Sequence, residues 1–362
     1  MSEKILGVPY KTKHFDLPNR FVMAPLTRQR AAAGHVPHSL NALYYAQRAS
    51  AGLIITEASQ ISPRGLGYQN TPGIYSKEQI EGWKLVTEAV HDRKGKIFCQ
   101  LWHVGRHSHP LLQEDGGLPF GPSEIVETVP ITTPNGKMAP VVPHAMTINE
   151  INETIEDYVR AAQNAIEAGF DGVEIHGANG YLIDQFLNDT SNVRDDEYGG
   201  SIPNKCRFAI KVTSAVVEAI GSARVGIRLS PSGTNFGVLN NDPVGTFKFL
   251  IEKLDAFDLA YIHLIEPVLK SITDLPQYLR KVTPYFRPMI KTTLITSAGY
   301  DFNSAEQAIK TDEADLVAFG KMFISNPDLV ERYLTDAELT PFDVETFYGG
   351  GASGYTDYPF LK

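Results

Sequence analysis

The chain has 362 residues, of which 43% are hydrophobic and 21% are charged, so we expect a packed core in one large domain or two ordinary ones. Its net charge of −9 argues against a nucleic-acid backbone or an anionic membrane as the main partner. Cys99 and Cys206 lie far apart and form no metal-binding pattern, and we expect them to be reduced in a cytoplasmic protein. The hydropathy pattern predicts neither a signal peptide nor a membrane span.

One unit recurs along the chain: a short apolar run, a loop with Gly or Pro, and a helical pattern. The apolar runs are 20–24, 53–56, 96–101, 172–175, 225–229, 260–264, 293–296 and 316–319. Apolar residues at helical spacing follow in 77–93, 151–166 and 243–254, and Asn326-Pro327 predicts an N-cap with proline at the first helical position. These units predict an α/β fold, a (β/α)8 TIM barrel formed as a single domain over residues 1–362.

A doubly wound sheet is the alternative architecture. It would favour a Gly-x-Gly-x-x-Gly turn after the first strand, where this chain has Ala24-Pro25-Leu26-Thr27-Arg28 instead. The absence of that turn favours the barrel.

Two segments do not fit the repeating unit. Residues 103–143 lack helical periodicity, and their interleaved Val, Ile and Thr predict a hairpin lid inserted after the third strand. The lid begins with His103, His107 and His109, which have no carboxylates at fixed spacing, so we expect solvated side chains rather than a metal site. The tail 347–359 is rich in glycine and aromatic residues and is either a surface strap or a wall of the site.

The most informative motif is His176-Gly177-Ala178-Asn179-Gly180-Tyr181-Leu182, which directly follows a predicted strand. His and Asn can donate hydrogen bonds, and Tyr can donate a proton. These groups suit a substrate oxygen that gains negative charge while a neighbouring carbon gains a proton. On the residues alone, the motif could equally satisfy local backbone groups.

In a TIM barrel the carboxyl ends of the strands converge on one site, and the last two loops commonly bind phosphate. The last two strands are followed by Ala298-Gly299 and Gly320-Lys321, which offer backbone N–H groups and a positive charge. Other strand ends deliver hydrogen-bonding groups for a planar ring: Thr27, Gln100 and Arg228. A phosphate at one end and a heteroatom-rich ring at the other describe flavin mononucleotide (FMN).

Several stretches together closely resemble the old yellow enzyme family of FMN-dependent ene-reductases, along nearly the whole chain. The matching stretches are 24–28, 55–58, 100–102, 176–182, 196–201, 228–231 and 325–329. The resemblance implies a tightly bound FMN, with NADPH or NADH as hydride donor. It also implies small-molecule substrates, phenolic inhibitors, and a monomer or homodimer that binds neither nucleic acid nor membrane.

The resemblance also implies a role for each matching residue. His176 and Asn179 would bind the substrate oxygen, and Tyr181 would be the proton donor. Thr27 would bond a flavin carbonyl, and Gln100 and Arg228 would hold the pyrimidine part. The remaining residues would line the cofactor (Pro25, Leu26, Ala58, Ala298, Gly299, Gly320, with Lys321 at the phosphate) or wall the substrate pocket (Tyr68, Trp102, Phe236, Tyr355).

Two positions affect how the cofactor and the substrate would be held. Family members usually carry Arg where this chain has Lys321, and lysine lacks the bidentate fork of arginine. Where the family pairs His176 with His or Asn, this chain has Asn179, so we expect a substrate clamp that depends less on pH.

We therefore expect ping-pong reduction of activated alkenes (α,β-unsaturated aldehydes, ketones and nitroalkenes) by NAD(P)H. The alternatives are another FMN barrel acting on hydroxy acids or dihydropyrimidines, a non-catalytic flavin carrier, and a glycoside hydrolase that uses Glu57 and Glu174. A carrier would need the phosphate and ring contacts but not Tyr181.

Overall fold

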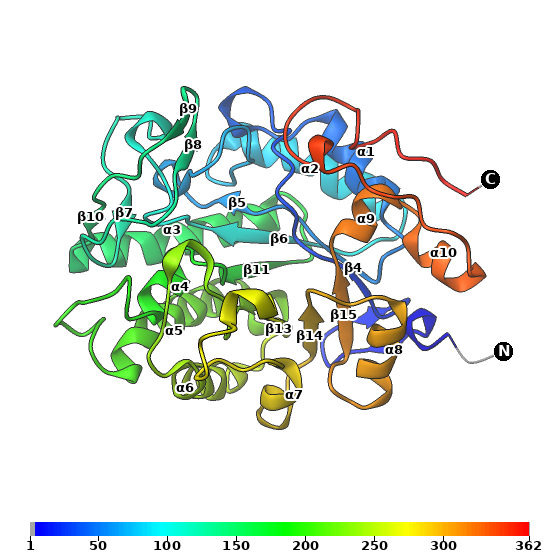
Figure 1. Cartoon of the computed structure of the whole chain (residues 1–362). Coiled ribbons are helices and arrows are strands. Elements are labelled where there is room, and N and C mark those ends of the chain that lie inside the picture. The colour runs from blue at the N-terminus through cyan, green and yellow to red at the C-terminus, as the bar shows by residue number, and fades with distance from the viewer. Residues whose placement is uncertain (1–3, 362) are drawn as a thin grey trace.

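The computed structural model describes residues 4–361, which form a closed barrel of parallel strands surrounded by helices (Figure 1). β15 pairs with β3, and β11 pairs with β6, which closes the ring. The strands are β3 (Phe21–Met23), β4 (Leu53–Ile55), β6 (Ile97–Trp102), β11 (Gly172–Gly177), β12 (Val225–Leu229), β13 (Tyr261–Ile265), β14 (Leu294–Ser297) and β15 (Leu316–Phe319). The predicted TIM barrel is confirmed, and each predicted strand lies within two residues of its observed ends.

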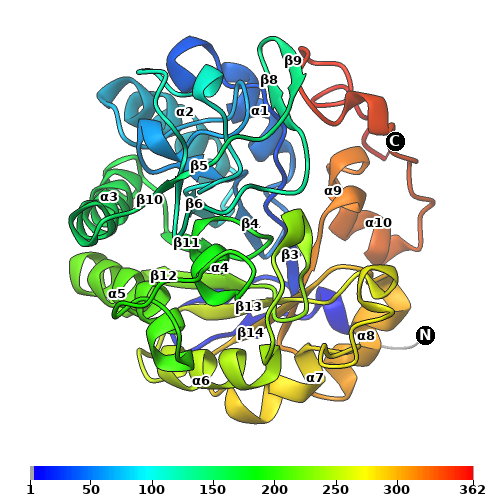
Figure 2. The same ribbon diagram turned by 60° about the vertical axis from the view of Figure 1, so that its left-hand side comes forward.

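Helices cover the outside of the barrel (Figure 2). They are α1 (Ser39–Gln47), α2 (Lys77–His91), α3 (Ile148–Glu167), α4 (Leu182–Leu187), α5 (Ile202–Ile220), α6 (Pro243–Asp255), α7 (Thr283–Phe286), α8 (Phe302–Lys310), α9 (Lys321–Ser325) and α10 (Leu329–Thr335). Capping boxes begin α2 at Ser76 and α3 at Thr147, where side chains satisfy the first free amides. Within residues 4–361, no helix combines the length and apolar character needed to cross a membrane.

The predicted cap at Asn326 is wrong. α10 begins at Leu329, after Asp328, so Pro327 lies before the helix. Asn326 is used elsewhere, since its Oδ1 accepts a hydrogen bond from Thr340 N at 2.8 Å. Asp328 instead accepts a hydrogen bond from Arg332 Nε at 2.7 Å. The Asn326 side chain is therefore occupied by a residue 14 positions further along the chain and does not cap the helix.

Two apolar layers hold the barrel together. The larger layer lies between the strands and the helices, and it includes Phe208 on α5. The smaller layer fills the barrel interior and includes Phe98 on β6. The hairpin of β1 (Tyr10–Lys11) and β2 (Asp16–Leu17) contributes Leu17 to this interior layer, with Tyr10 and Phe15 packed against it. Phe98 and Phe208 are thus both core residues.

The lid contains the predicted hairpin. β8 (Ile131–Thr133) and β9 (Gly136–Met138) pair antiparallel, and Figure 2 shows them at the top of the molecule. β7 (Phe120–Gly121) pairs in parallel with β10 (His144–Ala145) and ties the middle of the lid to the segment that directly follows it. The short β5 (Ser59–Gln60) pairs with the carboxyl end of β6, where the lid begins.

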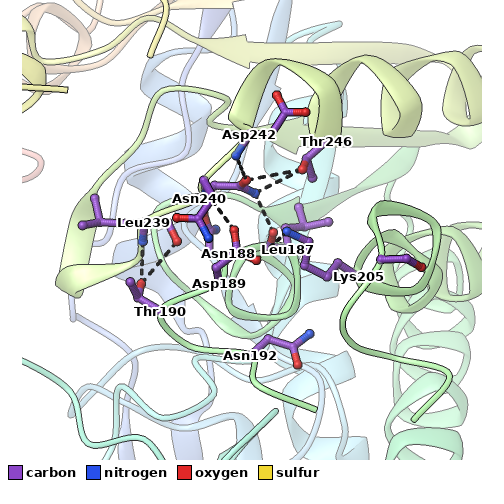
Figure 3. A network of polar contacts seen from close by, with 12 residues as sticks. Leu187, Asn188, Asp189, Thr190, Asn192, Lys205, Leu239, Asn240, Asp242 and Thr246 are labelled. Carbon is purple, nitrogen blue, oxygen red and sulfur yellow. Dashed lines mark hydrogen bonds and ion pairs between the residues drawn. The ribbon is translucent and has the colours of Figure 1, made fainter. Parts of the chain in front are cut away.

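A polar network fastens the loop after β12 to the segment between α4 and α5 (Figure 3). Asn240 Nδ2 donates to Leu187 O at 2.7 Å, and Leu239 N donates to Thr190 Oγ1 at 2.6 Å. The loop held in this way carries Phe236, one of the predicted pocket residues.

Candidate active site

Polar side chains of neighbouring strands lie side by side in the barrel. The strand register places Gln100 beside Glu174, and Arg228 between His176 and His263. Gln100 Nε2 donates to Glu174 Oε1 at 2.6 Å, and His263 Nδ1 lies 2.8 Å from Glu174 Oε2. The buried Glu174 carboxylate therefore orients Gln100, one of the predicted flavin ligands.

The turn after β11 has a strained backbone that several hydrogen bonds hold. Asn179 and Gly180 have positive φ angles of 58° and 78°. A Cβ on Gly180 would lie 2.5 Å from Asn235 O, so this position requires glycine. Asn179 N donates to Ser230 Oγ at 2.8 Å, and Gly180 N donates to Asp184 Oδ2 at 2.8 Å. The turn is thus supported from α4 and from the loop after β12.

The three predicted catalytic residues lie at the end of β11 and in the turn that follows it. The rings of His176 and Tyr181 have centroids 5.2 Å apart. Asn179 Oδ1 accepts a hydrogen bond from Asn235 Nδ2 at 3.2 Å. The other end of the same side-chain amide, Nδ2, can therefore donate a hydrogen bond to a ligand. Burial, with Arg228 and His263 adding to it, lowers the pKa of His176 well below its usual range. His176 is therefore a neutral hydrogen-bond donor at neutral pH.

Aromatic side chains enclose Tyr181. Trp102 meets it edge-on at 4.9 Å between centroids, and Phe236 lies at 5.6 Å. Tyr68 stacks in parallel on Trp102 at 5.8 Å, and its hydroxyl oxygen is 3.1 Å from that of Tyr181. Burial, with Tyr68 adding to it, raises the pKa of Tyr181 well above its usual range. Tyr181 is thus a protonated phenol at neutral pH. Ala58 packs in the same apolar cluster as Tyr181 and Trp102.

Unpartnered donors mark the place for a polar ring. Within residues 4–361, Trp102 Nε1, His176 Nδ1 and Arg228 Nε are buried without a hydrogen-bond partner. Arg228 Nη2 reaches Ser297 Oγ only at 3.5 Å. A buried polar group left unpaired costs about 1–3 kcal/mol, so a ligand that pairs Arg228 would be favoured. Arg228, together with Gln100 and with Thr27 half-buried after β3, therefore fits the ring of FMN.

The residues predicted for the phosphate end border an accessible surface. Ala298 and Gly299 are exposed and have positive φ angles of 75° and 81°. A Cβ on Gly299 would meet no atom within 4 Å, whereas one on Gly320 would lie 3.2 Å from Leu26 Cδ2. Pro25 and Leu26 are half-buried, and Lys321 is exposed at the start of α9. Open backbone beside a lysine fits the phosphate of FMN.

The expectation that Tyr355 walls the substrate pocket is wrong. Its side chain is fully buried and stacks on Tyr44 of α1 at 4.0 Å. Its hydroxyl accepts a hydrogen bond from Asn41 Nδ2 at 3.1 Å. Tyr355 therefore anchors the tail to α1 and cannot contact a substrate.

A different tail residue faces the site. Tyr348 is 62% exposed, and its phenol adds to the raised pKa of both Tyr68 and Tyr181. The sequence contained this residue among the tail aromatics, but spacing alone did not distinguish it from Tyr355.

The expectation of solvated histidines at the start of the lid is wrong for two of the three. His103 and His107 are buried, at 1% and 4% exposure, and His109 is half-buried. His107 Nδ1 lies 2.6 Å from Glu127 Oε1, and His107 Nε2 lies 2.7 Å from the Tyr68 hydroxyl. Sequence reasoning missed this contact, because Glu127 lies 20 residues further along an irregular segment.

The two carboxylates of the glycoside-hydrolase alternative do not form an open pair. Glu57 is buried, and its Oε2 accepts hydrogen bonds from Arg28 N at 3.0 Å and Gln29 N at 3.2 Å. Glu174 is also buried and is occupied by Gln100 and His263. Both carboxylates support the barrel rather than face a sugar.

Comparisons with known proteins agree with this geometry. The sequence profile of the NADH:flavin oxidoreductase / NADH oxidase family matches residues 6–339. The chain is 44% identical over 360 residues to 12-oxophytodienoate reductase 1 of Oryza sativa subsp. japonica, covering 99% of this chain and 93% of that relative.

Solved structures agree as well. The old yellow enzyme homologue of Zymomonas mobilis has a TM-score of 0.94 and 42% identity, covering 98% of this chain and 99% of the other. Morphinone reductase in complex with tetrahydroNAD has a TM-score of 0.92 and 45% identity, covering 99% and 98%. The chain therefore belongs to the NADH:flavin oxidoreductase / NADH oxidase family, the old yellow enzymes, and is an FMN-dependent oxidoreductase that uses NADH or NADPH to reduce C=C bonds.

Proposed function

We propose that His176 and Asn179 bind the carbonyl or nitro oxygen of an activated alkene, and that Tyr181 protonates its α-carbon. FMN, when bound, would supply the chemistry of hydride transfer between NAD(P)H and the β-carbon. The observation that carries this proposal is that His176, at the end of β11, and Tyr181, after the turn, have ring centroids 5.2 Å apart, with Asn179 between them along the chain.

The protonation states support these roles. A neutral His176 still donates one hydrogen bond, and it does so without the competing charge of an imidazolium. Tyr181 holds its proton until the substrate carbon gains negative charge. Two preorganised donors beside a protonated acid form the arrangement needed to stabilise and then protonate an enolate-like oxygen and carbon.

The cofactor contacts are assigned by position. Thr27, Gln100 and Arg228 would hold the ring, and the cationic Arg228 suits the pyrimidine edge. Pro25, Leu26, Ala58 and Ala298 would line the ring and its chain, with Gly299, Gly320 and Lys321 at the phosphate. Support comes from the unpaired Arg228 Nε and from the open backbone at Gly299.

Substrates would lie among Tyr68, Trp102, Phe236 and Tyr348, so we propose compact, flat enones, enals and nitroalkenes. The relatives named for 12-oxophytodienoate and morphinone support an unsaturated ketone or a similar acceptor. Phenols should inhibit by placing their oxygen on His176 and Asn179. We also propose a cytoplasmic monomer or homodimer, and the two buried free cysteines, Cys99 and Cys206, support that compartment.

The test separates the two half-reactions. The purified protein is reduced anaerobically with NADPH and then mixed with 2-cyclohexen-1-one, while the visible flavin absorbance is followed. We expect bleaching and then recovery, and we expect Tyr181→Phe to slow only the recovery, by about 10²–10⁴-fold. Equal slowing of both phases, or normal recovery, would remove Tyr181 from the donor role. Tyr285→Phe, on the exposed face of α7, is the matched control.

A further inference from the structure

Behind Tyr181 lies a continuous chain of titratable side chains that the proposed chemistry does not yet use. The hydroxyl oxygens of Tyr181 and Tyr68 are 3.1 Å apart. The Tyr68 oxygen is 2.7 Å from His107 Nε2, and His107 Nδ1 is 2.6 Å from Glu127 Oε1. Every step is within hydrogen-bond distance, so the chain runs unbroken from the active site into the lid.

The far end of this chain lies largely out of solvent, and only part of His107 remains accessible. The side chains of His107 and Glu127 are 6% and 1% exposed. The Phe236 ring stacks on the His107 imidazole with centroids 3.9 Å apart. Glu127 Oε2 is buried without a partner in the described part of the chain. Glu127 Oε1 is thus placed to accept the Nδ1–H of His107, which leaves Nε2 directed at the Tyr68 hydroxyl.

Arg106 also faces the pair and holds the lid in place. Its guanidinium lies near Glu127 and donates to Ile125 O at 3.2 Å and to Phe236 O at 3.3 Å. Arg106 thereby ties the irregular lid segment that carries Glu127 to the loop that covers His107. The imidazole and the carboxylate are thus kept in register by contacts outside the pair.

Tyr181 needs a proton source during each turnover. As its proton moves to the substrate carbon, its oxygen would become a phenolate unless another proton arrives. Burial raises the pKa of both Tyr181 and Tyr68, so a phenolate at either position is costly. The Tyr68 hydroxyl lies 3.1 Å from the Tyr181 oxygen, so it is placed to supply the proton directly.

We propose that the His107–Glu127 pair reprotonates Tyr181 through Tyr68 during alkene reduction. The inference rests on the proposed role of Tyr181 as the proton donor. His107, Glu127 and Tyr68 act through Tyr181 and are relay residues, because none of them contacts the reacting carbon.

Each proton transfer breaks one bond and forms another. The O–H bond of Tyr181 breaks as a C–H bond forms on the substrate, and the Tyr68 proton moves to the Tyr181 oxygen. The Nε2 proton of the His107 imidazolium moves to the Tyr68 oxygen. His107 is left neutral, with its Nδ1–H donated to Glu127, and a solvent proton restores the imidazolium. One proton passes from solvent to carbon, and the relay carries no electrons.

The test uses His107→Gln in the full, FMN-loaded protein. Glutamine can still donate a hydrogen bond toward Tyr68, but it cannot accept and release a proton at neutral pH. The NADPH-reduced protein is mixed with 2-cyclohexen-1-one in mixtures of H₂O and D₂O, and the recovery of flavin absorbance is timed. We expect recovery to slow roughly tenfold, a smaller loss than for Tyr181→Phe.

The dependence on D₂O fraction separates a relay from a packing role. Several protons moving together give the wild type a curved dependence of rate on D₂O fraction, and we expect His107→Gln to make it linear. Glu127→Gln, which keeps the size of the side chain, should also slow recovery and straighten the curve. A packing defect would change the rate and leave the shape of the curve as in the wild type, which would overturn the proposal.

Two further variants make the result specific. His144→Gln breaks another histidine–carboxylate contact, with Glu150 at 2.9 Å and outside the relay, and should recover at the wild-type rate. If Tyr181→Phe recovers normally, the proton-donor role has failed and the relay with it. If Tyr181→Phe is slow while His107→Gln and Glu127→Gln match the wild type, the relay alone is overturned.

Discussion

Two sides of the barrel mouth use their polar groups in opposite ways. On the aromatic side, around Trp102, Tyr181 and His107, hydroxyl and imidazole groups are shared in a chain or left unpaired. On the tail side, the buried arginines Arg28 and Arg30 donate hydrogen bonds to backbone carbonyls of the tail.

The contacts of these arginines are extensive. Arg28 donates to Phe347 O at 2.9 Å, to Gly354 O at 2.7 Å and to Tyr44 OH at 3.0 Å. Arg30 donates to Gly351 O at 2.9 Å and Ser353 O at 3.0 Å. Figure 1 shows the tail that they hold running past α1, α9 and α10.

The two sides therefore have different roles: the aromatic side carries the groups that act on a ligand, and the tail side anchors the tail. Groups whose hydrogen-bonding capacity is fully used stabilise the fold and are poorly placed to move protons. Groups with spare capacity lower stability and can act on a ligand. Variants on the aromatic side should therefore change rates, and variants on the tail side should change the free energy of unfolding.

The largest expected effect is on the aromatic side. His176→Ala removes one preorganised donor for the substrate oxygen, so alkene-dependent recovery of flavin absorbance should slow by about 10²–10³-fold. Phenol affinity should fall as well. Stopped-flow absorbance and phenol titration measure the two effects, with His91→Ala on α2 as the exposed control. A rate within twofold of the wild type would contradict the donor role.

Arg28→Ala tests the tail side. It leaves the buried Tyr44 hydroxyl and the tail carbonyls without their donor, so the free energy of unfolding should fall by about 2–4 kcal/mol. Urea unfolding measures this change. Arg160→Ala, an exposed arginine in surface ion pairs, should change stability by less than about 0.5 kcal/mol. Equal effects of the two variants would show that the contacts of Arg28 with the tail add no stability.

Glu57, on the tail side, makes the free energy of unfolding depend on pH. Burial raises the pKa of Glu57 from 4.5 to about 7, although hydrogen bonds from the backbone of Arg28 and Gln29 oppose the shift. The folded protein then holds one more proton than the unfolded chain between these values. The free energy of unfolding therefore falls as pH rises from about 4.5 to about 7, by at most ~1.4 kcal/mol per pH unit.

Glu57→Gln should remove this contribution. The variant's stability should fall less steeply with pH over the same window, and the difference should total about 1–3 kcal/mol at pH 7. Asp184, whose pKa burial also raises to about 7, remains in both proteins and cancels in the comparison. Parallel stability curves would show that Glu57 is ionised in the folded state throughout the window.

The smallest effect concerns Lys321, which links the phosphate end to the tail. Its Nζ lies 5.5 Å from the Phe342 ring centroid, and Phe342 lies 5.6 Å from Phe347. Lys321→Ala should weaken FMN binding by about 1 kcal/mol, five- to tenfold in Kd, measured by flavin fluorescence on dilution. Lys321→Arg should match or tighten binding, since its fork suits phosphate. Unchanged flavin content in Lys321→Ala would remove Lys321 from the phosphate site.

Much of the fold could be predicted because its signals are local. A strand buried on both faces needs a continuous apolar run, so eight such runs separated by helical patterns predicted the barrel. His176, Asn179 and Tyr181 could be predicted together because they lie on one turn. Their neighbours Trp102, Gln100 and Arg228 followed from the convergence of strand ends.

Contacts between irregular segments could not be predicted in this way. His107 and Glu127 belong to a lid without periodicity, so nothing in their spacing showed that they meet. In the tail, positive φ angles at Gly349, Gly350 and Gly354 turn the chain between Tyr348 and Tyr355. These turns decide which aromatic residue faces the site and which is buried against α1.

The sequence by itself determined the barrel and the catalytic turn, because hydrophobic runs and adjacent residues act over short distances along the chain. Only the tertiary structure decided the pairing of His107 with Glu127, the start of α10 at Leu329 and the burial of Tyr355. Each of these depends on a partner that the folded chain brings from a distant or irregular segment. The free energy of burying a polar group depends on that partner, which local sequence does not specify.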